Sequence, residues 1–338
     1  LKEAISEGRE SPLEELEIQY ADYALWQREY LSEGVPGGVL EREVEYWKER
    51  LKDAAVLELP TDHTRPSAPS YRGGREKVEL SSEVCGELRR LSQREGATVF
   101  MALMAGFKAL LMRYSGEKDL SVGTVIANRT RREVEGLIGF FVNTLVMRTD
   151  LSGDPSFREL IKREREVALG AYARQEAPFE KLVEKINPQR DLSRSPLFQV
   201  MMVLQNARQG ESEIRGLKVS EVEVETGLAK FDLTLTLTEG REGIAGALEY
   251  SLDLYEGETI RRVARHYERL VEEMVKDVEL RIREVELLSE AERRQLIEVW
   301  NETDQTFGET RLAHEMIEEQ VRRRGETIAI RSESGELS

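Results

Sequence analysis

Hydrophobic and polar residues follow two periods along this chain, and each period predicts one type of secondary structure. In FDLTLTLTE (231–239) apolar and polar residues alternate strictly, which predicts a strand with one face on a core. FQVMMVL (198–204) is a continuous apolar run, as expected for a strand covered on both faces. VFMALMAGFKALLM (99–112) indicates a helix buried on most sides, shorter than the roughly 20 residues that a membrane crossing needs.

The same periods give the remaining elements. Helices are predicted at 11–31, 41–51, 81–96, 155–172, 177–186 and 257–275, and strands at 76–80, 119–127, 140–151, 217–225 and 244–251. Ser11 and Pro12 would cap the first helix, and a phase change between Val219 and Val222 indicates a bulge. Alternating strands and helices followed by meandering strands favour an α/β fold, with a mixed sheet and helices packed on it.

The pattern of apolar and polar residues changes after about Val278. A polar, Ser-capped helix is predicted within 287–304, and the segment 311–338 opens with another helix and reaches a new strand. We therefore expect a main body over 1–285, a linker over 286–310 and the start of a further domain over 311–338.

Composition narrows the class of protein. The chain has 338 residues, 40% of them hydrophobic, and a formal net charge of -16, which disfavours nonspecific binding to nucleic acid or anionic membrane. The opening LKEAISEGRE lacks the pattern of a secretory signal, and the lone Cys85 cannot form an intrachain disulfide. A cytoplasmic protein is the expectation.

Few residues are candidates for catalysis. The three histidines, His63, His266 and His314, are far apart in sequence and show no metal-ligand or nucleophile-base spacing. No phosphate-binding glycine loop or nucleophile elbow is present. Cys85 lies in a predicted helix between apolar neighbours and is expected to be packing. The residues alone thus predict an α/β domain without an evident activity, and no metal site.

Four stretches resemble, in order and spacing, the later motifs of nonribosomal peptide synthetase condensation domains: YADYALW (20–26), IGFFVNTLVMR (138–148), QEAPFEKLVE (175–184) and RDLSRSPLFQVMMVLQN (190–206). LPTDHTRP and FDLTLTL are similar to further stretches of the same family. The resemblance covers roughly residues 1 to 285. It implies a chloramphenicol-acetyltransferase-like fold, of which this chain would form the carboxy-terminal lobe, a two-layer sandwich.

The family joins two lobes around a tunnel, where the amine of an acceptor aminoacyl thioester attacks a donor thioester. Both substrates are carried on the phosphopantetheine of upstream and downstream carrier proteins, so no cofactor is expected on this chain itself. The hallmark HHxxxDG belongs to the amino-terminal lobe, and no His-His pair occurs in these residues. The resemblance therefore implies no catalytic residue here and an inactive isolated fragment.

The end of the chain carries a second resemblance. Residues 312–338, LAHEMIEEQVRRRGETIAIRSESGELS, are similar to the opening of an amino-acid adenylation domain, whose ATP-binding motifs would lie beyond Ser338. Condensation followed by adenylation is the order of an elongation module. The expected partners are the two carrier proteins, the amino-terminal condensation lobe and the adenylation domain.

Three residues are candidates for the substrate tunnel. Asn143 offers a donor and an acceptor that could position an amine or a pantetheine amide, or could instead bond adjacent backbone. Asp22 and Trp26 lie four apart on one predicted helix face, with core packing and a local hydrogen bond as the alternative. Gly139 is expected to allow a close backbone approach.

Structural roles are expected for the charged loop before the strand at 198–204. Arg190, Asp191 and Arg194 would form a charge-paired turn there.

The alternatives to a condensation domain are a related epimerization or heterocyclization domain, a noncatalytic docking module, and a stand-alone CoA-dependent acyltransferase. The VNT in IGFFVNTLVMR favours condensation over the first, and the adenylation-like tail argues against the last.

Overall fold

The computed structural model describes residues 4, 7–10, 13, 15–186, 191–205, 226–240, 243–304, 312–333 and 335–337. The chain divides into two compact units, Leu1–Leu287 and Leu288–Ser338, and each is described by itself.

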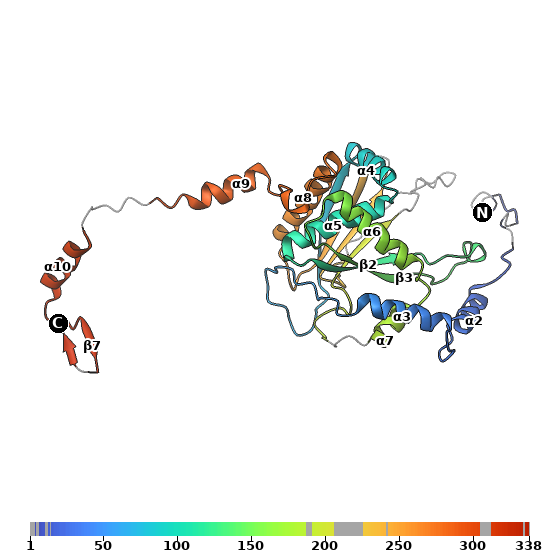
Figure 1. The fold of residues 1–338 in the computed structure, drawn as a ribbon, viewed down its shortest axis with the longest axis horizontal. Coiled ribbons are helices and arrows are strands. Elements are labelled where there is room, and N and C mark those ends of the chain that lie inside the picture. The colour runs from blue at the N-terminus through green and yellow to red at the C-terminus, as the bar shows by residue number, and fades with distance from the viewer. Residues whose placement is uncertain are drawn as a thin grey trace. The chain divides into compact units, whose positions relative to one another are not determined.

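A six-stranded mixed sheet organises the first unit, with the strand order β1-β6-β5-β4-β2-β3 (Figure 1). Strand β4 runs parallel to both β2 and β5, and the other neighbours are antiparallel. The strands are β1 (Gly73–Ser81), β2 (Asp119–Ile126), β3 (Asn143–Asp150), β4 (Val200–Gln205), β5 (Leu233–Glu239) and β6 (Gly243–Ser251). The mixed sheet agrees with the sequence-based prediction.

Helices pack against this sheet to make the second layer. They are α4 (Ser82–Arg94), α5 (Val99–Ser115), α6 (Phe157–Tyr172) and α8 (Gly257–Lys276), which contact one another and the strands. Two more, α3 (Val39–Leu51) and α7 (Phe179–Ile186), contact each other, and α7 contacts β3 (Figure 1). Among the described residues, the unit also contains helix α2 (Tyr20–Tyr30) and the short 3-10 helices η1 (Arg132–Val134) and η2 (Ile282–Glu284).

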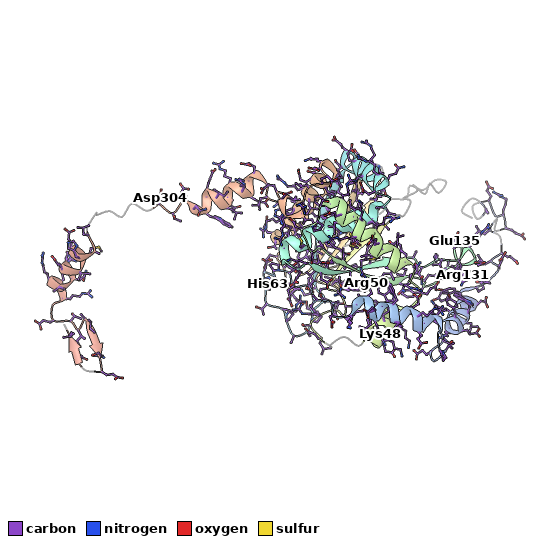
Figure 2. All side chains as sticks on the ribbon, viewed as in Figure 1. Lys48, Arg50, His63, Arg131, Glu135 and Asp304 are labelled. Atoms are coloured by element: carbon purple, nitrogen blue, oxygen red, sulfur yellow. The ribbon has the colours of Figure 1, made fainter. Side chains whose placement is uncertain are left out.

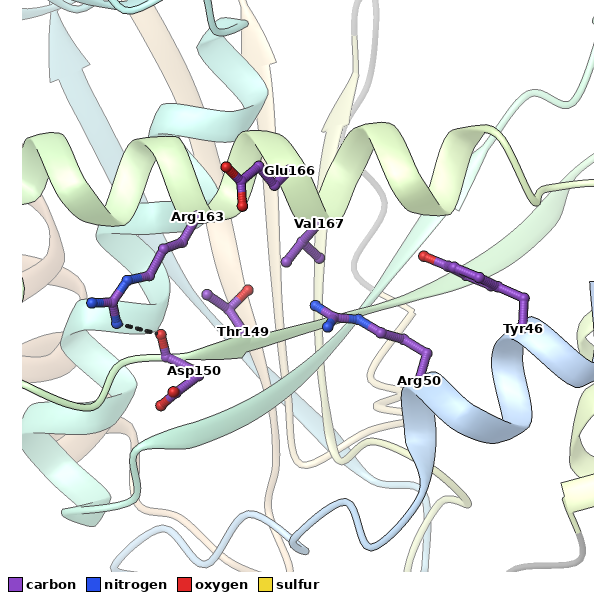
Figure 3. A pocket seen from close by; sticks show the side chains of 7 residues that line it. All are labelled: Tyr46, Arg50, Thr149, Asp150, Arg163, Glu166 and Val167. Atoms are coloured by element: carbon purple, nitrogen blue, oxygen red, sulfur yellow. Dashed lines mark hydrogen bonds between the residues drawn. The ribbon is translucent and has the colours of Figure 1, made fainter.

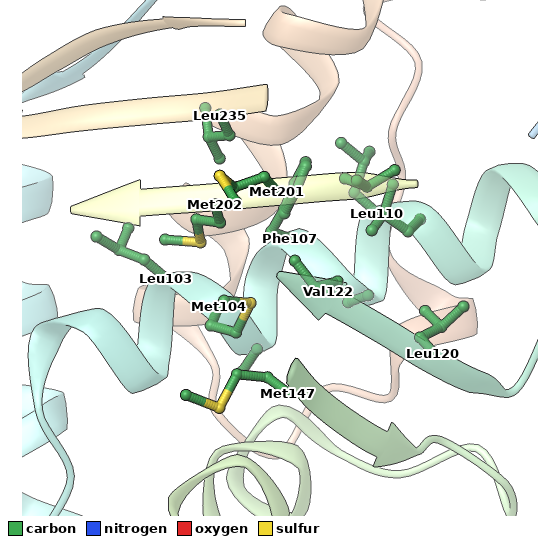
Figure 4. Close-up of a cluster of buried hydrophobic side chains, with 14 of the residues drawn as sticks. Leu103, Met104, Phe107, Leu110, Leu120, Val122, Met147, Met201, Met202 and Leu235 are labelled. Carbon is green, nitrogen blue, oxygen red and sulfur yellow. The ribbon is translucent and has the colours of Figure 1, made fainter. Parts of the chain in front are cut away.

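Helix α5 occupies the centre of the core (Figure 4). Every residue from Met101 to Met112 is buried, because the sheet covers one side of α5 and the helices α4, α6 and α8 contact the others. Its Leu103 and Phe107 belong to the same buried cluster as Val122 of β2 and Leu235 of β5. The prediction of a helix buried on most sides is confirmed.

Two predicted boundaries are wrong. The helix expected from residue 11 begins at Tyr20, because Gln19 is its N-cap: the Gln19 backbone N–H donates to Oδ2 of Asp22, 2.8 Å away. The strand expected from residue 140 begins at Asn143, because the preceding residues leave the sheet to pack on α2. The bulged strand predicted at 217–225 lies outside the described residues.

The second unit contains α9 (Glu290–Ile297), the 3-10 helix η3 (Val299–Asn301), α10 (Ala313–Arg324) and a hairpin of β7 (Ile330–Ser332) and β8 (Gly335–Leu337). Ser289 caps α9, since its Oγ accepts the N–H of Glu292. The Ser cap, the second helix and the strand after it agree with the sequence-based prediction.

Among the described residues, no single helix is long and apolar enough to cross a membrane. The pair α4 and α5 passes the length and composition test together, but its axes are bent by 105° at their junction.

Candidate functional site

A small aromatic cluster lies apart from the main core, where α2 meets the loop between β2 and β3. Tyr23, Val134, Leu137 and Phe141 are its buried members. The rings of Tyr23 and Phe141 lie 4.8 Å apart between centroids, and the hydroxyl of Tyr20 donates to the carbonyl of Phe140 at 2.9 Å. These contacts fix the segment 138–142 against α2.

Gly139 is required at this contact. A Cβ atom at that position would overlap the ring of Tyr20, at a separation that real side chains do not show. A glycine therefore lets the backbone pass directly over the aromatic ring.

The outer side of the same segment is apolar and open. Ile138, Phe140 and Val142 are exposed to 94%, 77% and 47%, while Leu137 and Phe141 between and beside them point into the aromatic cluster. We call these three side chains the 138–142 face. Large apolar groups are seldom presented together in this way unless something covers them.

Trp26 and Asp22 have partners within the chain. The indole of Trp26 stacks on Tyr30 at 4.7 Å and lies under the guanidinium of Arg131, 4.3 Å from the ring centre. Figure 2 places Arg131 on the loop beside α2. Asp22 caps its own helix through the N–H of Gln19. The two side chains thus share a helix but have separate structural partners, and a contact of either with substrate stays a prediction.

Asn143, the first residue of β3, is 7% exposed and its amide is fully used. Its Nδ2 donates to the carbonyls of Gln175 and Ala177 at 2.9 and 2.8 Å. Its Oδ1 accepts the N–H of Thr144 at 2.9 Å and of Phe179 at 3.1 Å. Two donors and two lone pairs are all that a side-chain amide has.

These four bonds give the partners of Asn143 within the chain, and the expectation that its amide faces a substrate tunnel stays a prediction. The bonds match the alternative weighed from the sequence, in which Asn143 bonds backbone. Most of that backbone, however, is more than 30 residues away, in the loop before α7 and at the first residue of that helix. Direct contact with a substrate would require one of these bonds to break, so it stays a prediction.

The charged turn before β4 is tied to its surroundings. Asp191 accepts hydrogen bonds from the N–H and Oγ of Ser193, at 2.8 and 2.7 Å, and these bonds hold the pKa of its carboxyl below the usual value. Arg194 lies 2.8 Å from Glu58 and 3.5 Å from Asp191. Arg190 lies outside the described residues.

A second charged contact near this turn was not predicted. Arg65, from the irregular connector, forms a two-pronged hydrogen bond with Asp232 at 2.9 and 2.5 Å, and the carboxylate keeps the pKa of the guanidinium above its usual value. Arg65 also donates to the carbonyl of Ser193. The only sign of this contact in the sequence was that Arg65 lies in LPTDHTRP and Asp232 in FDLTLTL. Neither stretch indicates that the other is its partner.

A polar groove runs between α3 and α6 along β3 (Figure 3). A cavity of about 360 Å³ there is lined by Tyr46, Arg50, Thr149, Asp150, Arg163, Glu166 and Val167. Arg50 donates to the carbonyl of Arg148 and Arg163 to that of Asp150, so both guanidinium groups bind outward-facing carbonyls near the edge of the sheet. The lining offers charges of both signs but no histidine, cysteine or serine.

The described residues contain no group of three or more His, Cys, Asp or Glu arranged to hold a metal ion. His63 is bound to Glu256 at 2.9 Å, the ring of His266 to the hydroxyl of Tyr114 at 2.7 Å, and His314 is exposed. Cys85 is buried, which raises the pKa of its thiol. None of these groups has the environment of an activated nucleophile or of a base poised beside one.

Comparison with known proteins defines the class. Residues 3–297 match the family model described as the condensation domain, and the chain therefore belongs to the condensation-domain family. Its fold is the chloramphenicol-acetyltransferase-like fold of that family.

Individual relatives are large synthetases. The chain is 45% identical over 330 residues to a linear gramicidin synthase protein of Brevibacillus parabrevis, and the match covers 97% of the chain and 6% of that protein. It is 41% identical over 328 residues to malpinin synthetase of Mortierella alpina, covering 97% of the chain and 4% of that protein. The chain thus spans about a twentieth of the length of these curated relatives.

Solved structures give the same fold. The X-domain from teicoplanin biosynthesis superposes with a TM-score of 0.75 at 29% identity, covering 84% of this chain and 66% of that one. The four-domain nonribosomal peptide synthetase AB3403 superposes with a TM-score of 0.75 at 24% identity, covering 88% of this chain and 24% of that one, which shows the fold alone.

Proposed function

We propose that this chain is part of a nonribosomal peptide synthetase elongation module and contributes one lobe of its condensation domain. The reaction is attack of the amine of an acceptor aminoacyl thioester on a donor acyl or peptidyl thioester, giving an amide. The observation that carries the proposal is the family match over 3–297, together with relatives whose names are those of peptide synthetases.

We propose that no residue of this chain moves the proton of the reaction. The chain contains no His-His pair, and its three histidines are bound to other side chains or exposed. We assign the catalytic histidine to an amino-terminal lobe that pairs with this one. We assign the 138–142 face as the surface that contacts that lobe. Its three apolar side chains are exposed beside α2, the helix that contains YADYALW.

Carrier proteins would bring both thioesters on their phosphopantetheine arms, and this chain would bind no cofactor itself. Residues 312–338 would begin an adenylation domain, with ATP bound only by residues that follow. The formal net charge of -16 disfavours nonspecific binding to nucleic acid.

The test compares the chain with the intact module. Donor and acceptor carrier proteins are loaded, mixed with either protein, and the products are measured by mass spectrometry. The intact module should form the dipeptidyl thioester and the 338-residue chain should not. Amide formation by the chain alone would contradict the assignment of the catalytic histidine, and an inactive intact module would contradict condensation.

One observation favours a second candidate, a noncatalytic docking module. The chain superposes with a TM-score of 0.76 at 30% identity on the X-domain in the complex of the X-domain and OxyB from teicoplanin biosynthesis. Titration of the chain with a loaded carrier protein and with an adenylation domain separates the candidates. Tight binding by an intact module that forms no amide would favour docking. An epimerization or heterocyclization domain would instead invert or cyclise the loaded residue.

A further inference from the structure

The loop Arg174–Phe179, between α6 and α7, is held from two sides by side chains of other elements. From β3, the Asn143 amide binds the carbonyls of Gln175 and Ala177 and the N–H of Phe179. From α3, the indole Nε1 of Trp47 donates to the carbonyl of Arg174 at 2.9 Å. Four backbone groups of one short loop are therefore bound by two side chains.

Trp47 is well placed to hold the loop rigidly. Its side chain is 1% exposed, and its ring packs edge-on against Tyr46 with 5.4 Å between centroids. A buried indole has a single N–H, and here that donor is used on the loop. One turn earlier on α3, Glu43 is 4% exposed and its Oε1 lies 3.4 Å from Nη1 of Arg174.

The loop also reaches the aromatic cluster beside α2. Glu176 is close enough to Tyr23 for its charge to add to burial in raising the pKa of that phenol. On the other side, Ala177 is fully buried and the ring of Phe179 lies 5.7 Å from Phe198. The loop thus lies between the main core and the aromatic cluster beside α2.

Asn143 connects this loop to the 138–142 face. It follows Val142 directly in the chain, so a shift of the loop that moved the Asn143 side chain would also move the last residue of that face. Because three of the four hydrogen bonds of the amide go to the loop, the loop position and the start of β3 are set together.

We propose that Trp47 is a positioning residue for the condensation reaction: together with Asn143 it fixes the Arg174–Phe179 loop and, through it, the 138–142 face and α2. The inference rests on the proposed function, since the face it fixes is the one assigned to the partner lobe. Because the Trp47 side chain is buried, it acts through the loop and not on the substrate. Its effect on rate comes from the geometry of the two lobes, where a displacement of about 1 Å can cost up to about a hundredfold in rate.

The test is Trp47→Phe in the intact module, which keeps an aromatic ring and removes the N–H. Amide formation at saturating loaded carrier proteins should fall about tenfold, after the rate is divided by the folded fraction measured at the assay temperature. Tyr267→Phe is the matched control, because Tyr267 is likewise fully buried and the substitution removes a single hydrogen bond, to the carbonyl of Leu103 in α5, away from the loop. Its rate should stay within twofold of the wild type.

Hydrogen exchange gives a readout that does not depend on activity. In Trp47→Phe the amide of Phe179 should exchange faster, and Asn143→Asp, which replaces the donating NH₂ group, should show the same exchange and the same loss of rate. Faster exchange with an unchanged rate would overturn the proposal, and so would a loss of rate that disappears on correction for the folded fraction. An inactive wild-type module would refute the proposed function, whereas a normal rate for Trp47→Phe in an active module refutes only this inference.

Discussion

Helix α5 carries one charge into the core, and its removal should be costly. Nζ of Lys108 lies 2.8 Å from Oε2 of Glu164 and 2.8 Å from Oγ1 of Thr149, and both charged side chains are completely buried. Burial lowers the pKa of Lys108, and the attraction of Glu164 acts in the opposite direction. The pair is therefore a balance between desolvation and attraction.

The magnitude follows from that balance. Lys108→Met leaves the Glu164 carboxylate buried without its counter-charge, and Oε1 of Glu164 already has no hydrogen-bond partner among the described residues. Breaking one side of such a pair costs about 3–5 kcal/mol of unfolding free energy. Replacing both partners, as in Lys108→Met with Glu164→Leu, should cost less than about 1 kcal/mol, since neither charge then has to be desolvated.

Urea unfolding followed by circular dichroism measures this double-mutant cycle. The coupling energy between the two substitutions should exceed about 2 kcal/mol, with an unchanged slope of free energy against urea. The exposed pair of Arg89 and Glu239, 2.6 Å apart, is the control and should couple by about 0–1 kcal/mol. A loss below about 1 kcal/mol for Lys108→Met alone, or equal losses for the single and double variants, would refute the reasoning.

Three further outcomes follow from single contacts. Gly139→Ala should lower the melting temperature by about 2–4 °C for each kcal/mol of unfolding free energy lost, and Tyr20→Ala in the same chain should recover part of that loss by removing the overlapping ring. Cys85 should react with a thiol reagent at pH 8 only as fast as the chain unfolds, since burial hides it and raises its pKa; fast reaction of the native chain would contradict this. Because hydrogen bonds from Ser193 lower the pKa of Asp191, its contribution to stability is complete above the unfolded pKa and disappears as pH falls through the folded pKa. Asp191→Asn should remove that acid-range part of the stability curve, and an unchanged curve would show that the bonds to Ser193 do not stabilise the turn.

The observed position of Asn143 changes how its motif is interpreted. A buried amide in a strand-like sequence had to meet a partner, and both a substrate group and backbone were possible. The structure supplies four backbone partners, three of them in the stretch QEAPFEKLVE. The stretches IGFFVNTLVMR and QEAPFEKLVE are therefore joined by hydrogen bonds. Neither stretch alone predicts this connection.

Much of the local structure could be predicted from the sequence. The strict alternation in β5 buries Leu233, Leu235 and Leu237, and the continuous apolar run of α5 lies in the core. Serines at the helix starts cap α4, α6 and α9. These features depend on residues within one or two turns of each other, so the period and the capping side chain are sufficient.

The two wrong boundaries have different origins. The helix expected from Ser11 begins at Tyr20 because Gln19 and Asp22 form a local capping box. The strand expected from Phe140 begins at Asn143 because Phe141 packs on Tyr20, with 5.3 Å between ring centroids, although the two residues are distant along the chain. A single sequence does not show which distant segment will pack against a given stretch.

The sequence by itself determined which faces are apolar, where most elements start, and which stretches resemble a known family. Only the tertiary structure decided the partners: Trp47 with the carbonyl of Arg174, Lys108 with Glu164, and Arg65 with Asp232. The physical reason is that periodicity fixes the direction of a side chain relative to its own helix or strand. The identity of a partner depends on how separate elements pack, which is set by the whole core.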